Sequence, residues 1–387
     1  MDKNNPLMKA YQRTRIIIIE YTWAIILLIV MMLVWYYKRQ INKSTNNDYQ
    51  MEATYDKYPP QISNINSVDA KFAFSEKQGT GHVRDYYIAS SYNSCCGGDF
   101  QDDYVSLVPL KEVIFHGARV LDFEVYVVKN ELVVAASPND SFYIKGTYNS
   151  LPLGGKNGVL SFVNGHAFSN GSCPNPEDPL FVHLRIKSDK KNIYDKLTKY
   201  VREAFPGKLL NAEYGYEGRS NAPGGGINIG REPLLDFKGK VIIICDQLNK
   251  NYRNTSFEEL INLSGNSAYF KEHRSYDIQY TYNPSSLENF SKKYIILTMP
   301  DLSSLDDNVP ASLHFSYGCQ MVCMCYQQVD DNMKYYLDKF NSAGTAFILK
   351  PDNLRYIPVV LQKPTPQNVQ LSYAPKSIDL PMYKTSI

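Results

Sequence analysis

Two strand-like segments carry ionisable side chains spaced two residues apart. Asp122 and Glu124 lie in ARVLDFEVYVV, and His183 and Arg185 lie in LFVHLRI. Residues i and i+2 of a strand point to the same face, so each pair is expected to project together. His183 is the best candidate for acid–base chemistry among the six histidines. A single histidine is more often a satisfied interior residue, however, and no second one has matching spacing.

Other patterns that could carry chemistry are weaker. The sequence has no G-x-x-x-x-G-K-[ST] motif, and its Gly-rich stretch 221–230 lacks a lysine and follows no clear strand. A flexible loop is favoured there over a phosphate cradle. The seven cysteines are odd in number and form no C-x-x-C pair, so neither a disulfide framework nor a zinc site stands out.

Composition excludes some classes of protein. The 387 residues carry 41 basic and 39 acidic side chains, and a net charge of +2 argues against a dedicated nucleic-acid binder. The 44% hydrophobic content is too high for wholesale disorder and sufficient for a sizeable core. The length allows one large domain or two ordinary ones.

A long apolar segment near the N-terminus predicts a membrane anchor. IIIIEYTWAIILLIVMMLVWY (16–36) holds a single charged residue, Glu20. At about 1.5 Å per residue it spans roughly 31 Å, which matches a bilayer core of about 30 Å. The alternatives are a signal peptide or a buried core helix, but the run is long for a signal and no small-residue cleavage site follows.

We therefore predict a short N-terminal tail (1–15) and a single transmembrane helix over 16–37, with the lipid bilayer as its partner. Four basic residues precede the span and three follow it closely, which favours a cytoplasmic N-terminus. Polar residues 38–80 are expected to form a linker or stalk.

From residue 81 to 355, short apolar runs alternate with helical patterns, as in a parallel α/β fold. The length suits a TIM-type (β/α) barrel, and an open doubly wound sheet is the rival because it shares the same alternation. The candidate strands are rich in Val, Ile, Tyr and Phe. They are 85–92, 118–128, 180–186, 239–246, 293–300, 318–326 and 345–351.

Ordered blocks across this region resemble the eukaryotic phosphoinositide-specific phospholipases C. The most specific is GCQMVCMCYQ (318–327), similar to G-C-Q-m-V-a-l-n-F-Q, followed by NSAGTAFILKPDNLR (341–355). Other matching blocks are DYYIASSYNS (85–94), HGARVLDFEVY (116–126), DPLFVHLRI (178–186), FPGKLL (205–210) and FKGKVIII (237–244).

The resemblance implies both halves of a catalytic barrel. The first half would cover about 81–247 and the second about 286–355, with an insert at about 248–285. A Pro-containing tail, 356–387, would follow and lie extended over a surface.

The family's reaction uses two histidines as acid–base groups and a calcium ion held by one asparagine and three carboxylates. Asn93, Asp122 and Glu124 match calcium ligands, but Arg185 stands where the last carboxylate is expected. Further positions that do not match are Tyr92 and Ala136 for the two histidines, Ile244 for a substrate-binding lysine, and Leu297 and Met299 for a phosphate-binding R-x-Y.

These substitutions predict a barrel without its chemistry. We expect no bound cofactor, and we expect the Arg185 guanidinium to occupy the vacated metal position and to pair with Asp122 and Glu124. The alternative is that Arg185 points to solvent and the carboxylates bond to backbone groups.

The favoured function is a membrane-anchored pseudoenzyme that binds a protein or a phosphoinositide head group, or has a structural role. The alternative is an active phosphoric diester hydrolase that uses calcium and a rearranged site, with His183 as a relocated acid or base. A carbohydrate- or protein-binding domain is a third interpretation, supported by the 31 tyrosines.

Overall fold

The computed structural model describes nine stretches of the chain. They are residues 6–65, 81–98, 105–137, 141–144, 149–218, 226–246, 251–302, 307–357 and 373–386. The predicted linker from 66 to 80, the start of the Gly-rich stretch at 221–225 and the tail from 358 to 372 lie outside the described residues.

Eight parallel strands form the centre of the fold and follow one another in chain order around a barrel. β1 pairs with both β2 and β10, and the paired strands run from β7 round to β8. In the described part of the chain no ladder joins β7 to β8, so the barrel is nearly closed. The strands are β1 (Tyr86–Ser91), β2 (Val120–Val128), β5 (Leu180–Lys187), β6 (Val241–Cys245), β7 (Leu263–Ser264), β8 (Phe270–Arg274), β9 (Ile295–Met299) and β10 (Met321–Met324).

Three further strands pair outside the parallel ladder. β3 (Glu131–Ala135) runs antiparallel to β2 and also pairs with β4 (Leu151–Pro152). β11 (Phe347–Leu349) runs antiparallel to β1. The candidate strand at 345–351 is therefore a strand, but it lies outside the parallel barrel.

The prediction of an insert at 248–285 is wrong. This segment holds β7 and β8, which are two of the eight barrel strands. β8 has the sequence FKEHR, and only Phe270 gives it an apolar signal. A strand this polar looks like a loop when its partners are not known.

Helices surround the barrel in the usual βα order. On α5 (Ile193–Ala204), Ile193, Leu197 and Val201 are buried along one stripe, as their spacing of four residues predicts. α9 (Asp331–Ala343) begins where Asp330 accepts a hydrogen bond from the Met333 amide (2.8 Å) and ends at Gly344, whose φ of 67° favours glycine. The remaining helices are α3 (Leu107–Phe115), α4 (Val159–Ala167), α6 (Ser275–Gln279), α7 (Pro284–Lys293) and α8 (Ala311–Ser316).

Short 3₁₀ segments complete the connections. They are Val83–Asp85, Ala212–Tyr214, Tyr216–Gly218, Ile229–Arg231, Leu234–Phe237, Glu258–Leu260 and Asp352–Leu354.

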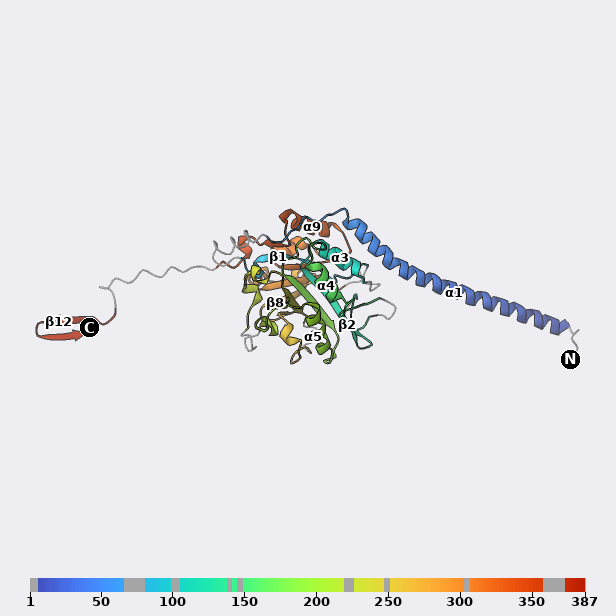
Figure 1. The fold of residues 1–387 in the computed structure, drawn as a ribbon, viewed down its shortest axis with the longest axis horizontal. Coiled ribbons are helices and arrows are strands. Elements are labelled where there is room, and N and C mark those ends of the chain that lie inside the picture. Colours follow the sequence, from blue (N-terminus) through green and yellow to red (C-terminus); the bar gives the residue numbers. More distant parts are fainter. Residues whose placement is uncertain are drawn as a thin grey trace.

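α1 (Pro6–Tyr55) is a single helix that leaves the barrel beside α3 as a long rod (Figure 1). Its stretch Arg13–Arg39 is long and apolar enough to cross a membrane, and none of its most apolar window is buried against the barrel. Within the predicted linker or stalk, residues 38–55 are helical, because α1 continues through them without a break.

The end of α1 is joined to the barrel by buried contacts. Met51 and Tyr55 are buried, and the Tyr55 hydroxyl donates a hydrogen bond to the Tyr326 carbonyl just after β10 (2.7 Å). Asp48 accepts a hydrogen bond from the Ser106 hydroxyl at the N-cap of α3 (2.7 Å). The apolar helix and the barrel are therefore linked by an ordered connection.

We expect Tyr55→Phe to lower the free energy of unfolding of the barrel by about 1–2 kcal/mol, because it leaves a buried carbonyl without its donor. Chemical denaturation of the full chain in detergent measures this. Tyr49→Phe on the same helix is the control, since Tyr49 is 71% exposed. Equal effects of the two substitutions would mean that the hydrogen bond contributes nothing.

The C-terminal segment contains a hairpin instead of the expected extended chain. β12 (Ser377–Leu380) pairs antiparallel with β13 (Tyr383–Ser386), and Pro381 and Met382 form the turn.

Candidate functional site

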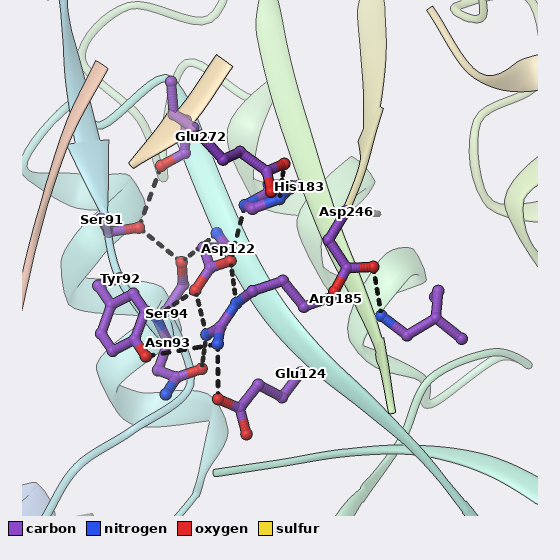
Figure 2. A network of polar contacts seen from close by, with 12 residues as sticks. Ser91, Tyr92, Asn93, Ser94, Asp122, Glu124, His183, Arg185, Asp246 and Glu272 are labelled. Atoms are coloured by element: carbon purple, nitrogen blue, oxygen red, sulfur yellow. Dashed lines mark hydrogen bonds and ion pairs between the residues drawn. The ribbon is translucent and has the colours of Figure 1, made fainter. Parts of the chain in front are cut away.

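Charged side chains from three strands, and from the residue after a fourth, gather at the carboxyl end of the barrel, where TIM-barrel enzymes place their active sites (Figure 2). β2 supplies Asp122 and Glu124, and β5 supplies His183 and Arg185. The two strands pair with Asp122 opposite His183 and Glu124 opposite Arg185. This register aligns the two i, i+2 pairs found in the sequence, and all four residues are buried.

The Arg185 guanidinium lies at the centre of this cluster. It binds Asp122 in a bidentate manner, with Nε to Oδ1 at 2.9 Å and Nη2 to Oδ2 at 2.7 Å. Nη1 lies 2.7 Å from Glu124 Oε1 and 3.3 Å from the Tyr92 hydroxyl, and Nη2 lies 2.7 Å from Asn93 Oδ1. These contacts use all five N–H donors of the side chain. The expected ion pairs with Asp122 and Glu124 are thus present, and the alternative of a solvent-facing Arg185 is wrong.

The loop after β1 completes the surroundings of Arg185. The Tyr92 ring lies 4.6 Å from the guanidinium carbon in a cation–π contact. Asn93 has a φ of 42°, a conformation that asparagine tolerates better than most residues. Its backbone N–H donates a hydrogen bond to Asp122 Oδ2 (2.8 Å). Burial raises the pKa of Tyr92, so its hydroxyl stays protonated.

His183 lies between two carboxylates. Its Nδ1 lies 2.9 Å from Asp122 Oδ1 and forms an ion pair with it, but the geometry is not that of a hydrogen bond. Its Nε2 lies 3.1 Å from Glu272 Oε1 on the other side. Burial alone would lower the pKa of His183, but the contacts with Asp122 and Glu272 outweigh it and raise the pKa to about 9. The imidazole is therefore held as a cation near neutral pH.

Asp122 is held as an anion by the same arrangement. Burial would raise its pKa, but Arg185 and then His183 hold the pKa of this carboxyl well below its usual range. In return, Asp122, Tyr92 and Glu124 raise the pKa of Arg185 well above its usual value, against the effect of burial. The cluster is therefore an ion network with fixed charges.

Two members of the network, Glu272 and Arg274, come from β8 and were missed by the sequence reasoning. Glu272 reaches His183, and Arg274 Nη1 lies 3.2 Å from the Tyr92 hydroxyl and 2.8 Å from the Pro300 carbonyl. The available signal was the i, i+2 spacing of two charges in FKEHR, the same spacing that marks β2 and β5.

Asp246 follows β6 and is a further buried acid beside the network. Its Oδ1 accepts a hydrogen bond from the Ile186 amide (3.0 Å), and its Oδ2 has no hydrogen-bond partner. Burial, followed by the nearby Glu272 carboxylate, raises the pKa of Asp246 to about 7. Three carboxylates, Asp122, Glu124 and Glu272, are thus paired with the His183 and Arg185 cations, and the Asp246 carboxyl is partly protonated near neutrality.

The other predicted site positions lie in or beside the same strands without joining the network. Ala136 follows β3, Ile244 is in β6, and Leu297 and Met299 are in β9. All four are buried, and three of them have no side-chain polar atom. They therefore contribute packing at these positions and offer no group for proton transfer or anion binding.

The oxygens that would bind calcium are directed at Arg185. Calcium takes six to eight oxygen ligands, and Asn93, Asp122 and Glu124 each already accept a hydrogen bond from the guanidinium. A fixed cation within hydrogen-bond distance of these atoms repels a divalent ion. Within the residues the structure describes, no group of three His, Cys, Asp or Glu side chains is arranged to hold a metal. The residues present do not fit calcium.

Neither a protein-family model nor a curated protein sequence matches the chain. Solved structures do match. PLC21 from S. officinalis superposes with a TM-score of 0.55 at 17% identity over 72% of this chain, and PLC21 from L. pealei gives 0.55 and 17% over 71%. The chain spans only 38% of the length of each.

The fold is therefore a phospholipase C-like barrel of the TIM type. Among solved structures it is similar to the two PLC21 proteins, and at this level of identity the likeness concerns the fold alone.

Proposed function

We propose that this protein is a membrane-anchored phospholipase C-like pseudoenzyme, with a binding or structural role at the membrane. One observation carries the proposal: the Arg185 guanidinium is bonded to Asn93, Asp122 and Glu124 at the carboxyl end of the barrel. A buried, fully bonded cation at this position leaves no place for a divalent ion to stabilise a reacting phosphate.

The acid–base side of the reaction is also missing. Tyr92 and Ala136 stand where the resemblance implies histidines, and the buried phenol of Tyr92 has a raised pKa. A proton shuttle needs a pKa near the operating pH. His183 is held as a cation between Asp122 and Glu272, so it is poorly suited to take over as a relocated base near neutrality.

The exposed apolar stretch of α1 supports the membrane part of the proposal. Side chains of residues 16–19 and 25–37 are exposed, and such a long uncovered apolar surface is costly in water. Because α1 is continuous to Tyr55, the anchor would hold the barrel at a defined distance from the bilayer. The partner would be a protein or a phosphoinositide head group.

The test uses the full chain in nanodiscs that contain phosphatidylinositol, with and without calcium or a chelator. We expect no release of inositol phosphates above the level of empty nanodiscs, and no change in the melting temperature of the barrel on adding calcium. A calcium-dependent phosphoinositide-specific phospholipase C assayed in the same discs is the positive control.

Asp122→Ala separates the two candidate functions. Calcium-dependent turnover that this substitution abolishes would overturn the proposal and favour an active phosphoric diester hydrolase with a rearranged site. Turnover that Asp122→Ala leaves unchanged would indicate a contaminating enzyme.

A further inference from the structure

A cavity of about 450 Å³ lies between the end of α1 and two loops at the carboxyl end of the barrel. α1 contributes Asn47, Gln50 and Thr54, and the loop after β10 contributes Gln327 and Gln328. The volume falls within the range of small-molecule sites, roughly 300–1,000 Å³. None of the ion-network residues is among the side chains that line it, so it is a separate site.

The chemistry of the lining selects a class of ligand. None of the described residues that line this cavity carries a charge, and the Asp48 carboxylate beside Gly97 is bonded to the Ser106 hydroxyl. An anionic or cationic group would lose its hydration there without gaining a counter-ion. Four side-chain amides each offer both donors and an acceptor, which matches hydroxyl groups that donate and accept. Met51 and Val329 add apolar surface for the C–H face of a ring.

We propose that this cavity binds a neutral sugar ring. The arrangement of the amides supports the assignment. Asn47 and Gln50 line the cavity from α1, and Gln327 and Gln328 line it from the loop after β10, so hydroxyl groups on a ring between them would be hydrogen-bonded from two elements.

The place of the cavity along α1 bears on the source of the sugar. The apolar stretch ends at Arg39, and Asn47 lies eight residues further, about 12 Å along the helix axis. At this distance from the end of the apolar stretch, the sugar could come from a glycolipid head group, or it could be free or attached to a protein. All of these sources offer the same hydroxyl chemistry. The link to the bilayer rests on the proposed membrane anchor, whereas the sugar site does not.

Calorimetric titration of the full chain in phosphatidylcholine nanodiscs tests the proposal, with glucose, galactose, mannose and N-acetylglucosamine as probes. We expect at least one of these sugars to bind, and its phosphorylated form to bind at least tenfold more weakly. Discs that also contain glucosyl- or galactosylceramide distinguish the source. If the glycolipid in these discs competes with the soluble sugar, the source is a lipid head group. If it does not compete, the source is a soluble glycan. Both results support the site.

Two substitutions locate the binding. Gln50→Leu and Gln327→Leu are each expected to weaken it about tenfold without lowering the melting temperature. Asn46→Leu removes an amide from an exposed position of α1 outside the cavity and should leave affinity unchanged. Three results would each overturn the proposal: no binding at tens of millimolar sugar, equal binding of the phosphorylated form, or equal losses in all three variants.

Discussion

Replacing Arg185 with methionine is expected to lower the free energy of unfolding of the barrel by about 3–5 kcal/mol. The substitution removes five hydrogen bonds and leaves Asp122 and Glu124 buried with no guanidinium between them. Breaking one side of a buried ion pair is costly because the remaining charges keep their desolvation penalty. Urea denaturation of the full chain in detergent, followed by near-ultraviolet circular dichroism, measures the loss.

Two further variants establish the cause of that loss. Arg202→Met removes a guanidinium that is 51% exposed and pairs with Glu259 at 3.1 Å, so it should cost no more than about 1 kcal/mol. Combining Arg185→Met with Asp122→Asn and Glu124→Gln removes the uncompensated charges and should restore part of the stability. If Arg185→Met alone were as stable as the unmodified protein, Arg185 would not be the counter-ion that compensates the buried Asp122 and Glu124.

The second large effect is a pH dependence that belongs to His183. Its pKa is raised to about 9 in the folded protein from about 6.5 when unfolded, so the folded state holds the proton more tightly. The resulting stabilisation is fully present below pH 6.5 and is lost as the pH rises through 9. The difference corresponds to about 3 kcal/mol.

His183→Asn is therefore expected to destabilise the protein most at pH 6, and by about 3 kcal/mol less at pH 9.5. The comparison must be made between variants, because other groups titrate in the same range. Burial lowers the pKa of Lys350 to about 7, which makes stability rise with pH above that value. The raised pKa of Asp246 has the opposite effect: it makes stability fall as the pH rises from 3.8 to about 7.

Leu184→Ala is the control, since Leu184 is the buried apolar neighbour of His183 on β5. Its destabilisation should be the same at both pH values because it removes no ionisable group. A pH-independent effect of His183→Asn would mean that the imidazole is not held as a cation between Asp122 and Glu272.

The sequence alone predicted the parts of this protein that depend on local pattern. Six candidate strands correspond to barrel strands, because buried parallel strands have continuous Val- and Ile-rich runs. The apolar stretch of α1 was recognisable from its length and composition. The pairing of Arg185 with Asp122 and Glu124 was also predicted, because the family resemblance placed the three residues at one vacated metal position, and i, i+2 spacing put the side chains of each strand on one face.

Tertiary structure decided the rest. β8 was missed because four of the five residues in FKEHR are polar, and the partial burial of Glu272 and Arg274 makes sense only when His183 and Tyr92 are known to lie opposite. The continuation of α1 to Tyr55 was missed because its polar residues look like a linker until the α3 and β10 contacts are seen. Local pattern fixes which face a side chain takes, but only folding brings together the distant charges that make its burial tolerable.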